Sequence, residues 1–250
     1  MKRASLVAAA LLFSGMAPGM PQAADIKVLS TQATEEAYKE LVPQFETASG
    51  NKVATVFTGT LDAQKRLAAG ETYDLVIMAD GAIDEQIKLG KVAAGSRVDL
   101  AKSGVGAGVK AGAPKPDIST VDALKKTLLA AKSIGYSTGP SGVYILTMFE
   151  KLGVAAEVKP KLKQTPTGVF VGTIVANGTV EIGFQQVSEM SQFAGVDYVG
   201  PLPAPVQQIT VFSVGTHTAA REVEAAKALV KFLSAPAAAA AYKKRGLDPA

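Results

Sequence analysis

From Asp25 onward, short β-branched segments alternate with amphipathic segments. Residues 26–30, 52–57 and 73–80 are short apolar runs, which predict strands, while 35–50 and 61–70 predict helices. In the first helix Ala37, Leu41 and Phe45 recur every four residues, and Pro43 leads us to expect a kink or a break there. This β-α-β-α-β series predicts a mostly parallel sheet with helices on both faces.

The same pattern restarts after a Gly- and Pro-rich passage at residues 104–120. Ser119 or Thr120 is expected to cap a helix over 121–132. Strands are then predicted at 133–137, 161–165 and 180–187, with helices between them, so a second α/β unit of similar size follows the first. Segment 201–208 is the expected crossing between the units, and the chain closes with two helices separated by Pro236.

The stretch STGPSGVYILTMFEKLG, residues 137–153, joins an uncharged turn rich in hydroxyls to a helix with apolar residues at helical spacing. Ser141 can cap this helix through its hydroxyl, which is the simple structural interpretation. The same unpaired backbone N–H groups, with the helix dipole, can also hold an anion without Lys or Arg.

Three further strand-to-helix junctions share this composition, and none of the four contains a basic residue. They are Ser30-Thr31-Gln32, Thr58-Gly59-Thr60 and Pro166-Thr167-Gly168. Because ligands of open α/β sheets bind beyond the carboxyl ends of the strands, this recurrence favours one anion site between the two units. We expect the hydroxyls of Ser30, Thr58, Thr60 and Ser141 to point into that cleft.

Composition and the first residues narrow the classes of protein. Lys2 and Arg3, the apolar run 4–13 and the small residues near Ala24 are typical of a signal peptide, so we expect residues 1–24 to be removed on export. That loss leaves 24 basic and 22 acidic residues, a net charge of +2. Such a small excess of positive charge gives no indication of nucleic-acid binding. With no Cys and one His, His217, most transition-metal sites are excluded, and we expect no cofactor.

The order of elements, the segment DLVIMAD and the tail ALVKFLSAPAAAAAYKKRGLDP resemble the periplasmic solute-binding proteins of the molybdate-binding type. The resemblance covers essentially the whole mature chain. It implies a two-lobed type II periplasmic binding fold that closes on a small anion and delivers it, as a monomer, to an inner-membrane ABC permease. Lobe 1 would comprise residues 25–104 and 208–250, and lobe 2 residues 105–207.

The family holds its oxyanion with hydroxyls and backbone N–H groups, and those contacts map here by resemblance. They fall at Ser30, Thr31, Thr58, Gly59, Thr60, Ser141, Gly142, Thr167, Gly168, Val169 and Gln186. At the last position the family commonly has Tyr. Because Gln both donates and accepts, the exchange leaves open molybdate, tungstate or sulfate on one side and a di- or tricarboxylate on the other.

The resemblance also reaches a branch that includes aconitate isomerase, which carries out allylic proton transfer on a tricarboxylate. An enzyme needs an acid or base at the cleft, and Glu189 and His217 are the candidates. Each also has a structural interpretation, as a solvent-facing carboxylate and a histidine in a surface turn. Arg66 and Arg97 are the nearest basic residues, with surface roles as the alternative. A transcription-regulator effector domain shares this architecture, but the export signal and the lack of a helix-turn-helix segment argue against it.

Overall fold

The computed structural model describes residues 23–250, so the predicted signal segment lies outside the described residues except for Ala23 and Ala24. The strands are β1 (Asp25–Thr31), β2 (Lys52–Thr58), β3 (Leu75–Ala79), β4 (Val98–Lys110), β5 (Ile134–Tyr136), β6 (Leu162–Gln164), β7 (Ile182–Gln186), β8 (Val196–Pro201), β9 (Ile209–Thr216) and β10 (Asp248–Pro249).

The longer helices are α1 (Glu35–Ser49), α2 (Thr60–Ala68), α3 (Asp80–Lys88), α4 (Val121–Ala130), α5 (Pro140–Lys151) and α9 (Val223–Leu233). Shorter ones are α6 (Ala155–Val158), α7 (Val171–Ala176), α8 (Val187–Met190) and α10 (Ala239–Lys244). Single 3₁₀ turns are η1 (Gln32–Thr34), η2 (Lys159–Lys161), η3 (Ala204–Val206) and η4 (Pro236–Ala238).

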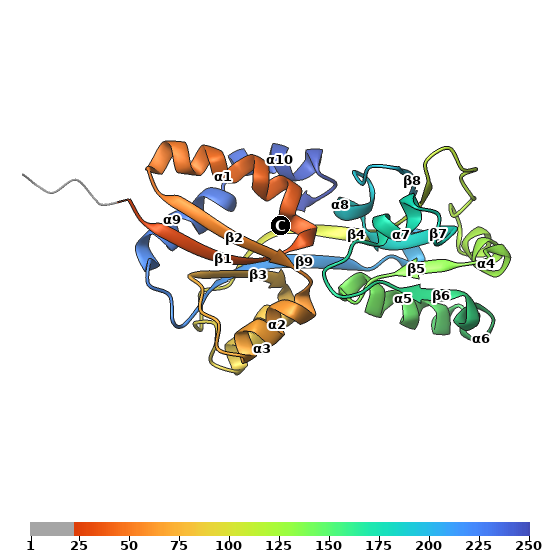
Figure 1. Ribbon diagram of the computed structural model, residues 1–250, viewed down its shortest axis with the longest axis horizontal. Helices are drawn as coiled ribbons and strands as arrows, with labels where there is room; N and C mark the ends of the chain where they lie inside the picture. The colour runs from red at the N-terminus through yellow and green to blue at the C-terminus, as the bar shows by residue number, and fades with distance from the viewer. Residues whose placement is uncertain (1–22) are drawn as a thin grey trace, which may run out of the picture.

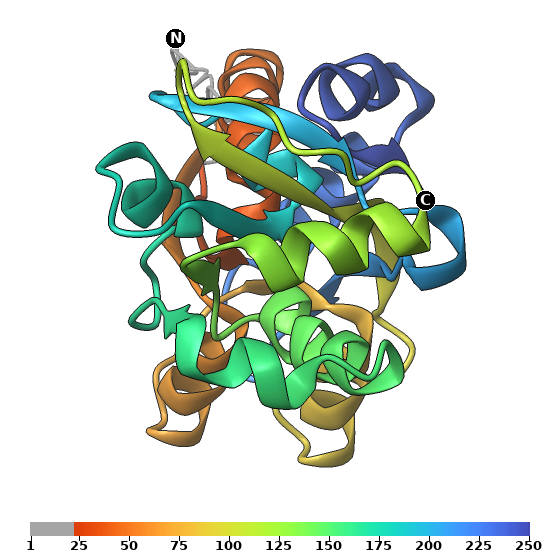
Figure 2. The same cartoon turned by 90° about the vertical axis from the view of Figure 1, so that its right-hand side faces the viewer.

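Two halves lie side by side, and β4 and β9 run between them (Figure 1). The strand order is β2-β1-β3-β9-β4-β7-β5-β6, with β8 and β10 also paired to β4. Strands β1, β2 and β3 are parallel, as are β5, β6 and β7, whereas β4 and β9 are antiparallel to their neighbours. The sheet is therefore mixed, and its parallel parts are the two units predicted from the sequence. Seen end-on, the strands lie between layers of helices (Figure 2).

The Gly-rich start of the passage 104–120 is the largest departure from the predicted elements, because it belongs to the long strand β4. Residues 98–104 of β4 pair with β9, and residues 105–109 pair with β7, so the strand passes from one half to the other at Gly104. Its glycines allow close packing: a Cβ on Gly106 would lie 2.7 Å from the Tyr198 ring, and one on Gly108 would lie 2.5 Å from the Met190 sulfur.

Other local expectations have mixed outcomes. Helix α1 is continuous through Pro43, so the alternative of a break is wrong; Pro43 removes one backbone donor while Leu41 and Phe45 hold the buried face. Thr120 caps α4 as predicted, accepting from the Ala123 N–H at 3.1 Å. Pro236 does separate the last two helices.

Buried apolar residues form separate clusters in the two halves. In one half, a first cluster packs α1, α9 and α10 against one face of β1 and β3. A second cluster packs α2 and α3 against the opposite face. The other pair packs α4, α5 and α7 on β5 and β7. None of these clusters of described residues mixes the two halves. We keep the lobe boundaries 25–104 with 208–250, and 105–207, as a proposal.

Candidate functional site

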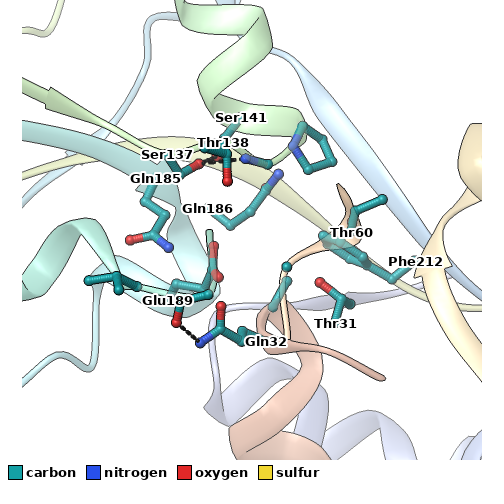
Figure 3. Close-up of a pocket in the computed structure, with 16 residues that line it drawn as sticks. Thr31, Gln32, Thr60, Ser137, Thr138, Ser141, Gln185, Gln186, Glu189 and Phe212 are labelled. Carbon is teal, nitrogen blue, oxygen red and sulfur yellow. Dashed lines mark hydrogen bonds between the residues drawn. The ribbon is translucent and has the colours of Figure 1, made fainter. Parts of the chain in front are cut away.

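A pocket lies where the carboxyl ends of the parallel strands of both halves face each other (Figure 3). We call it the inner pocket; its cavity of about 30 Å³ is the room taken by one or two water molecules. Its walls follow β1, β2, β5, β6 and β7, and Phe212 of β9 closes one side. The polar and glycine residues that line it are Thr31, Gln32, Gly59, Thr60, Ser137, Thr138, Gly139, Ser141, Gly168, Gln185, Gln186 and Glu189.

Two helices begin at this pocket, one from each half. Thr60 is the first residue of α2, and Ser141 is the second residue of α5. Neither cap residue, Gly59 or Gly139, offers a side chain to the first turn, so backbone N–H groups there keep no side-chain partner. Ser141 therefore does not cap α5, and its hydroxyl instead lies 3.4 Å from that of Ser137. The buried Thr60 hydroxyl has no hydrogen-bond partner within the described chain.

Seven of the eleven predicted ligand-binding residues line the inner pocket: Thr31, Gly59, Thr60, Ser141, Gly168, Val169 and Gln186. The other four lie just behind it. The Ser30 hydroxyl lies 3.1 Å from that of Thr34, and the Thr58 hydroxyl donates to Asp62 at 2.8 Å. Gly142 packs on the Ser137 carbonyl, and Thr167 lies beside Thr138. The hydroxyls of Ser30, Thr58 and Thr167 therefore have partners inside their own lobes.

One hydrogen bond joins the two halves across the front of the pocket. The Gln32 amide, after β1, donates to the Gly168 carbonyl, after β6, at 2.9 Å (Figure 3). Gly59 lies beside the same loop, and a Cβ there would approach the Gly168 nitrogen to 3.6 Å. The lobes thus touch over the small cavity, which is a closed arrangement of the cleft.

Gln186 lines the pocket but uses its amide elsewhere. In the orientation that satisfies both ends, its NH₂ donates to the Ser103 and Gly104 carbonyls at 3.1 Å, and its oxygen accepts from Thr210 at 3.0 Å. Ser103 and Gly104 belong to β4 and Thr210 to β9, the two strands that cross between the halves. Gln186 therefore fixes the crossing strands to β7 and has no amide hydrogen left for a ligand.

Glu189 is the one titratable side chain among the residues that line the pocket. Burial raises the pKa of this carboxyl to about 8; the Gln185 side chain and the Gln186 backbone N–H lower it only in part, and Glu35 raises it further. Gln185 accepts from the Val171 N–H at 2.7 Å, which leaves its NH₂ facing Glu189 (Figure 3). At neutral pH the carboxyl is mostly protonated and can donate a hydrogen bond.

The other titratable candidates lie away from the pocket. His217 is buried at the edge of β9, where its Nδ1 accepts from the Ala219 N–H. Arg66 pairs with Asp62 and Glu71 on α2, and Arg97 pairs with Asp84 and Asp99. No Lys or Arg is among the residues that line the inner pocket. In the part of the chain from residue 23 on, no cluster suits a metal ion, and no helix is long and apolar enough to cross a membrane.

Residue types alone did not identify several lining residues. Gln32, Ser137 and Thr138 lie at the predicted junctions, so their position was available as a signal although they were not singled out. Gln185 and Phe212 lie within strands, and their approach to the pocket depends on how β7 and β9 pair with β4.

A pocket built from helix starts and hydroxyls between two sheet-based lobes defines a two-lobed binding protein. The model of the bacterial extracellular solute-binding protein family matches residues 26–248, and the chain belongs to that family.

Two curated relatives are similar along most of the chain. An aconitate isomerase from Pseudomonas sp is 36% identical over 230 residues, covering 90% of this chain and 87% of the relative. The molybdate-binding protein ModA of Azotobacter vinelandii is 29% identical over 244 residues, covering 94% of each.

Solved structures of low identity share the fold. The periplasmic molybdate-binding protein of Azotobacter vinelandii has a TM-score of 0.76 at 19% identity, covering 89% of this chain and 98% of its own. The sulfate-binding protein SubI of Mycobacterium tuberculosis H37Rv has a TM-score of 0.73 at 19% identity, covering 90% and 87%. The predicted resemblance to molybdate-binding proteins and the two-lobed α/β fold are thereby confirmed.

Proposed function

We propose that the inner pocket binds carboxylate groups of a small unsaturated polycarboxylate and that Glu189 moves an allylic proton on it, as an isomerase of the aconitate type. The observation that carries the proposal is that Glu189, whose pKa is raised by burial, is the one ionisable side chain lining a pocket of helix starts and hydroxyls that contains no Lys or Arg. A receptor can hold an anion with the N–H and hydroxyl donors of the pocket alone, whereas an acid–base enzyme also needs a group that takes up and returns a proton.

The pocket has the donors that a carboxylate needs. The first turns of α2 and α5 direct backbone N–H groups and the positive ends of two helix dipoles toward it. The hydroxyls of Thr60 and Ser141 add donors, and the Thr60 hydroxyl has no competing partner in the described chain. The ligand charge is thereby held by hydrogen bonds and dipoles, and Glu189 in its ionised form is left to act as the base.

The proton transfer needs only Glu189 and the substrate. Its carboxylate removes a proton from the methylene carbon next to the double bond, and the double bond moves by one position. The resulting carboxylic acid then protonates the far carbon of the former double bond, so substrate and product have the same atoms and no co-reactant is consumed. A base with a pKa near 8 is stronger than an ordinary carboxylate and is half ionised at pH 8.

Similarity to a curated aconitate isomerase at 36% identity supports aconitate as the substrate to test first. The mature protein is incubated with cis-aconitate at pH 8, and proton NMR follows the vinyl signal of the trans isomer. We expect conversion by the native protein and none by Glu189→Gln, which keeps the shape of the side chain. Native protein that produces no more trans isomer than buffer would contradict the proposal.

A second candidate function is capture of a tetrahedral oxyanion for an ABC importer. The small cavity, about 30 Å³, favours it because an oxyanion needs less room than a tricarboxylate, and relatives named for molybdate and sulfate share the fold. Calorimetry with molybdate, tungstate and sulfate tests it. Tight binding of one of these, without binding of any polycarboxylate, would establish this candidate in place of the isomerase.

Export fits either function. Residues 1–24 carry the pattern of a cleaved signal, so we place the mature protein in the periplasm. Mass spectrometry of protein from a periplasmic extract should give an N-terminus at Ala24 or Asp25, and intact Met1 on most molecules would contradict this placement.

A further inference from the structure

A second, larger hollow adjoins the inner pocket on the side of α2, α3 and α5. We call it the outer groove; it has a volume of about 690 Å³ and lies between the two halves. Thr60, Thr138, Gly139 and Pro140 line both cavities, so the outer groove opens directly onto the helix starts that form the anion site.

The outer groove differs in chemistry from the inner pocket. Leu61 of α2, Val143 of α5 and Ile209 of β9 line it, with 44%, 62% and 51% of their surfaces exposed. Three exposed apolar side chains from three elements around one hollow are typical of a surface that contacts something apolar. Its charged lining residues within the described chain are two carboxylates, Asp80 and Glu85.

The inner pocket is too small for a whole organic acid, so a bound acid would occupy the outer groove as well. A cavity of about 30 Å³ accommodates one or two carboxylate oxygens of a ligand but not a branched carbon skeleton. In this closed arrangement the branch of an organic acid must extend past Thr60 and Pro140 into the outer groove, while its carboxylates and the carbon atoms next to them stay at the inner pocket that Glu189 lines. There Glu85, and more weakly Asp80, which pairs with Arg97 at 3.8 Å, disfavour a further anion, while Leu61, Val143 and Ile209 favour hydrocarbon.

We propose that the outer groove is a second subsite that takes an uncharged hydrocarbon substituent, so that the preferred ligands are succinate-type dicarboxylates with an alkyl or alkylidene branch. This inference rests on the proposed binding of an organic polycarboxylate. It narrows the substrate class, because aconitate is a succinate whose alkylidene branch ends in a third carboxylate, and an alkylidene succinate keeps the same allylic skeleton without that charge.

A matched pair of saturated ligands tests the subsite by calorimetry. 2-Isobutylsuccinate and tricarballylate carry branches of the same shape, one hydrocarbon and the other a carboxylate. Each buried methylene adds about 0.8 kcal/mol in full transfer, or about fourfold, so isobutylsuccinate should bind about tenfold or more tighter than succinate. Tricarballylate should gain nothing over succinate. Tricarballylate binding as tightly as isobutylsuccinate would overturn the proposal.

Substitutions in the outer groove test whether its lining residues cause the gain in affinity. Val143→Asp should remove the gain of isobutylsuccinate and leave succinate unchanged, whereas Leu146→Asp, on the same helix but outside the groove lining, should change neither. Glu85→Gln should improve tricarballylate binding by about fivefold, the effect of one exposed like charge. Equal isobutylsuccinate affinities for native protein and Val143→Asp would refute the subsite. If succinate and both derivatives fail to bind the native protein, the proposed function itself is wrong.

Discussion

The side-chain oxygen of Gln186 accepts from the Thr210 hydroxyl at 3.0 Å, and this contact joins the end of β7 to the crossing strand β9. With the bonds from its NH₂ to Ser103 and Gly104 of β4, Gln186 holds both strands that connect the halves. Gln186, which the family resemblance placed as a ligand contact, therefore also connects β7 to both crossing strands.

Replacing Gln186 by Leu should destabilise the protein and weaken the contacts of β7 with the crossing strands β4 and β9. Three buried hydrogen bonds are lost and two carbonyls lose a donor. We therefore expect the free energy of unfolding, measured by denaturant titration, to fall by about 2–4 kcal/mol. Amide hydrogen exchange over residues 103–106 should become faster. Thr210→Val removes one of the bonds and should cost about 1 kcal/mol. Unchanged stability with weaker ligand binding would instead assign Gln186 to the ligand.

The hydroxyls of Thr60 and Thr58 should separate binding from stability. Thr60→Val removes a buried hydroxyl that has no partner in the described chain, so stability should not fall, while affinity for a carboxylate should drop about tenfold. Thr58→Val removes the bond to Asp62 and should lower stability by about 1 kcal/mol with little effect on affinity. Calorimetry and thermal unfolding measure both quantities, and the reverse pattern would exclude Thr60 from the site.

Ligand affinity should depend on pH through Glu189. The pKa of this carboxyl is raised to about 8, so the carboxyl is protonated below that pH and charged above it. A bound anion favours the protonated form, and affinity should fall by about tenfold per pH unit above 8. Succinate suits the measurement because it cannot isomerise and both its carboxyls stay ionised. Glu189→Gln should abolish the dependence; a constant native affinity from pH 7 to 9 would refute the assignment.

His217 should affect stability and leave the site unaffected. Burial and then Lys91 lower its pKa in the folded protein, while Asp74 opposes them in part. The unfolded chain therefore binds the proton first, and stability should decline as pH falls below about 6.5, by at most about 1.4 kcal/mol per pH unit. His217→Gln should flatten this decline between pH 5 and 7 in thermal unfolding. A dependence unchanged in the variant would assign it to other groups.

Local signals in the sequence were sufficient for the parallel parts of the fold. Apolar periodicity predicted β1 to β3 with α1 and α2, and Thr120 identified the start of α4. Strand β4 was not predicted because Gly104, Gly106 and Gly108 have low strand propensity, and only contacts with Tyr198, Met190 and Gln207 explain them. Such contacts join residues distant in sequence, so the apolar periodicity of a single segment does not predict them.

The position of the candidate site was predictable for a related reason. The rule that ligands lie beyond the carboxyl ends of parallel strands selected the junctions at Thr60 and Ser141, and both residues line the inner pocket. It could not decide which hydroxyls are free: Ser30 and Thr58 lie at the same kind of junction but are bound by Thr34 and Asp62. The role of Gln186 depended on strand pairing between the halves, which the sequence pattern does not determine.

The central claim is that Glu189 is a neutral acid in the cleft at physiological pH, and its titration tests this most directly. Protein labelled with ¹³C at the glutamate carboxyls is followed by NMR from pH 3 to 10, with Glu189→Gln used to assign the signal. We expect one carboxyl with a midpoint near pH 8 that is missing in the variant. A Glu189 midpoint between pH 4 and 5 would contradict the account, because the carboxyl would then be a charged group in an anion pocket.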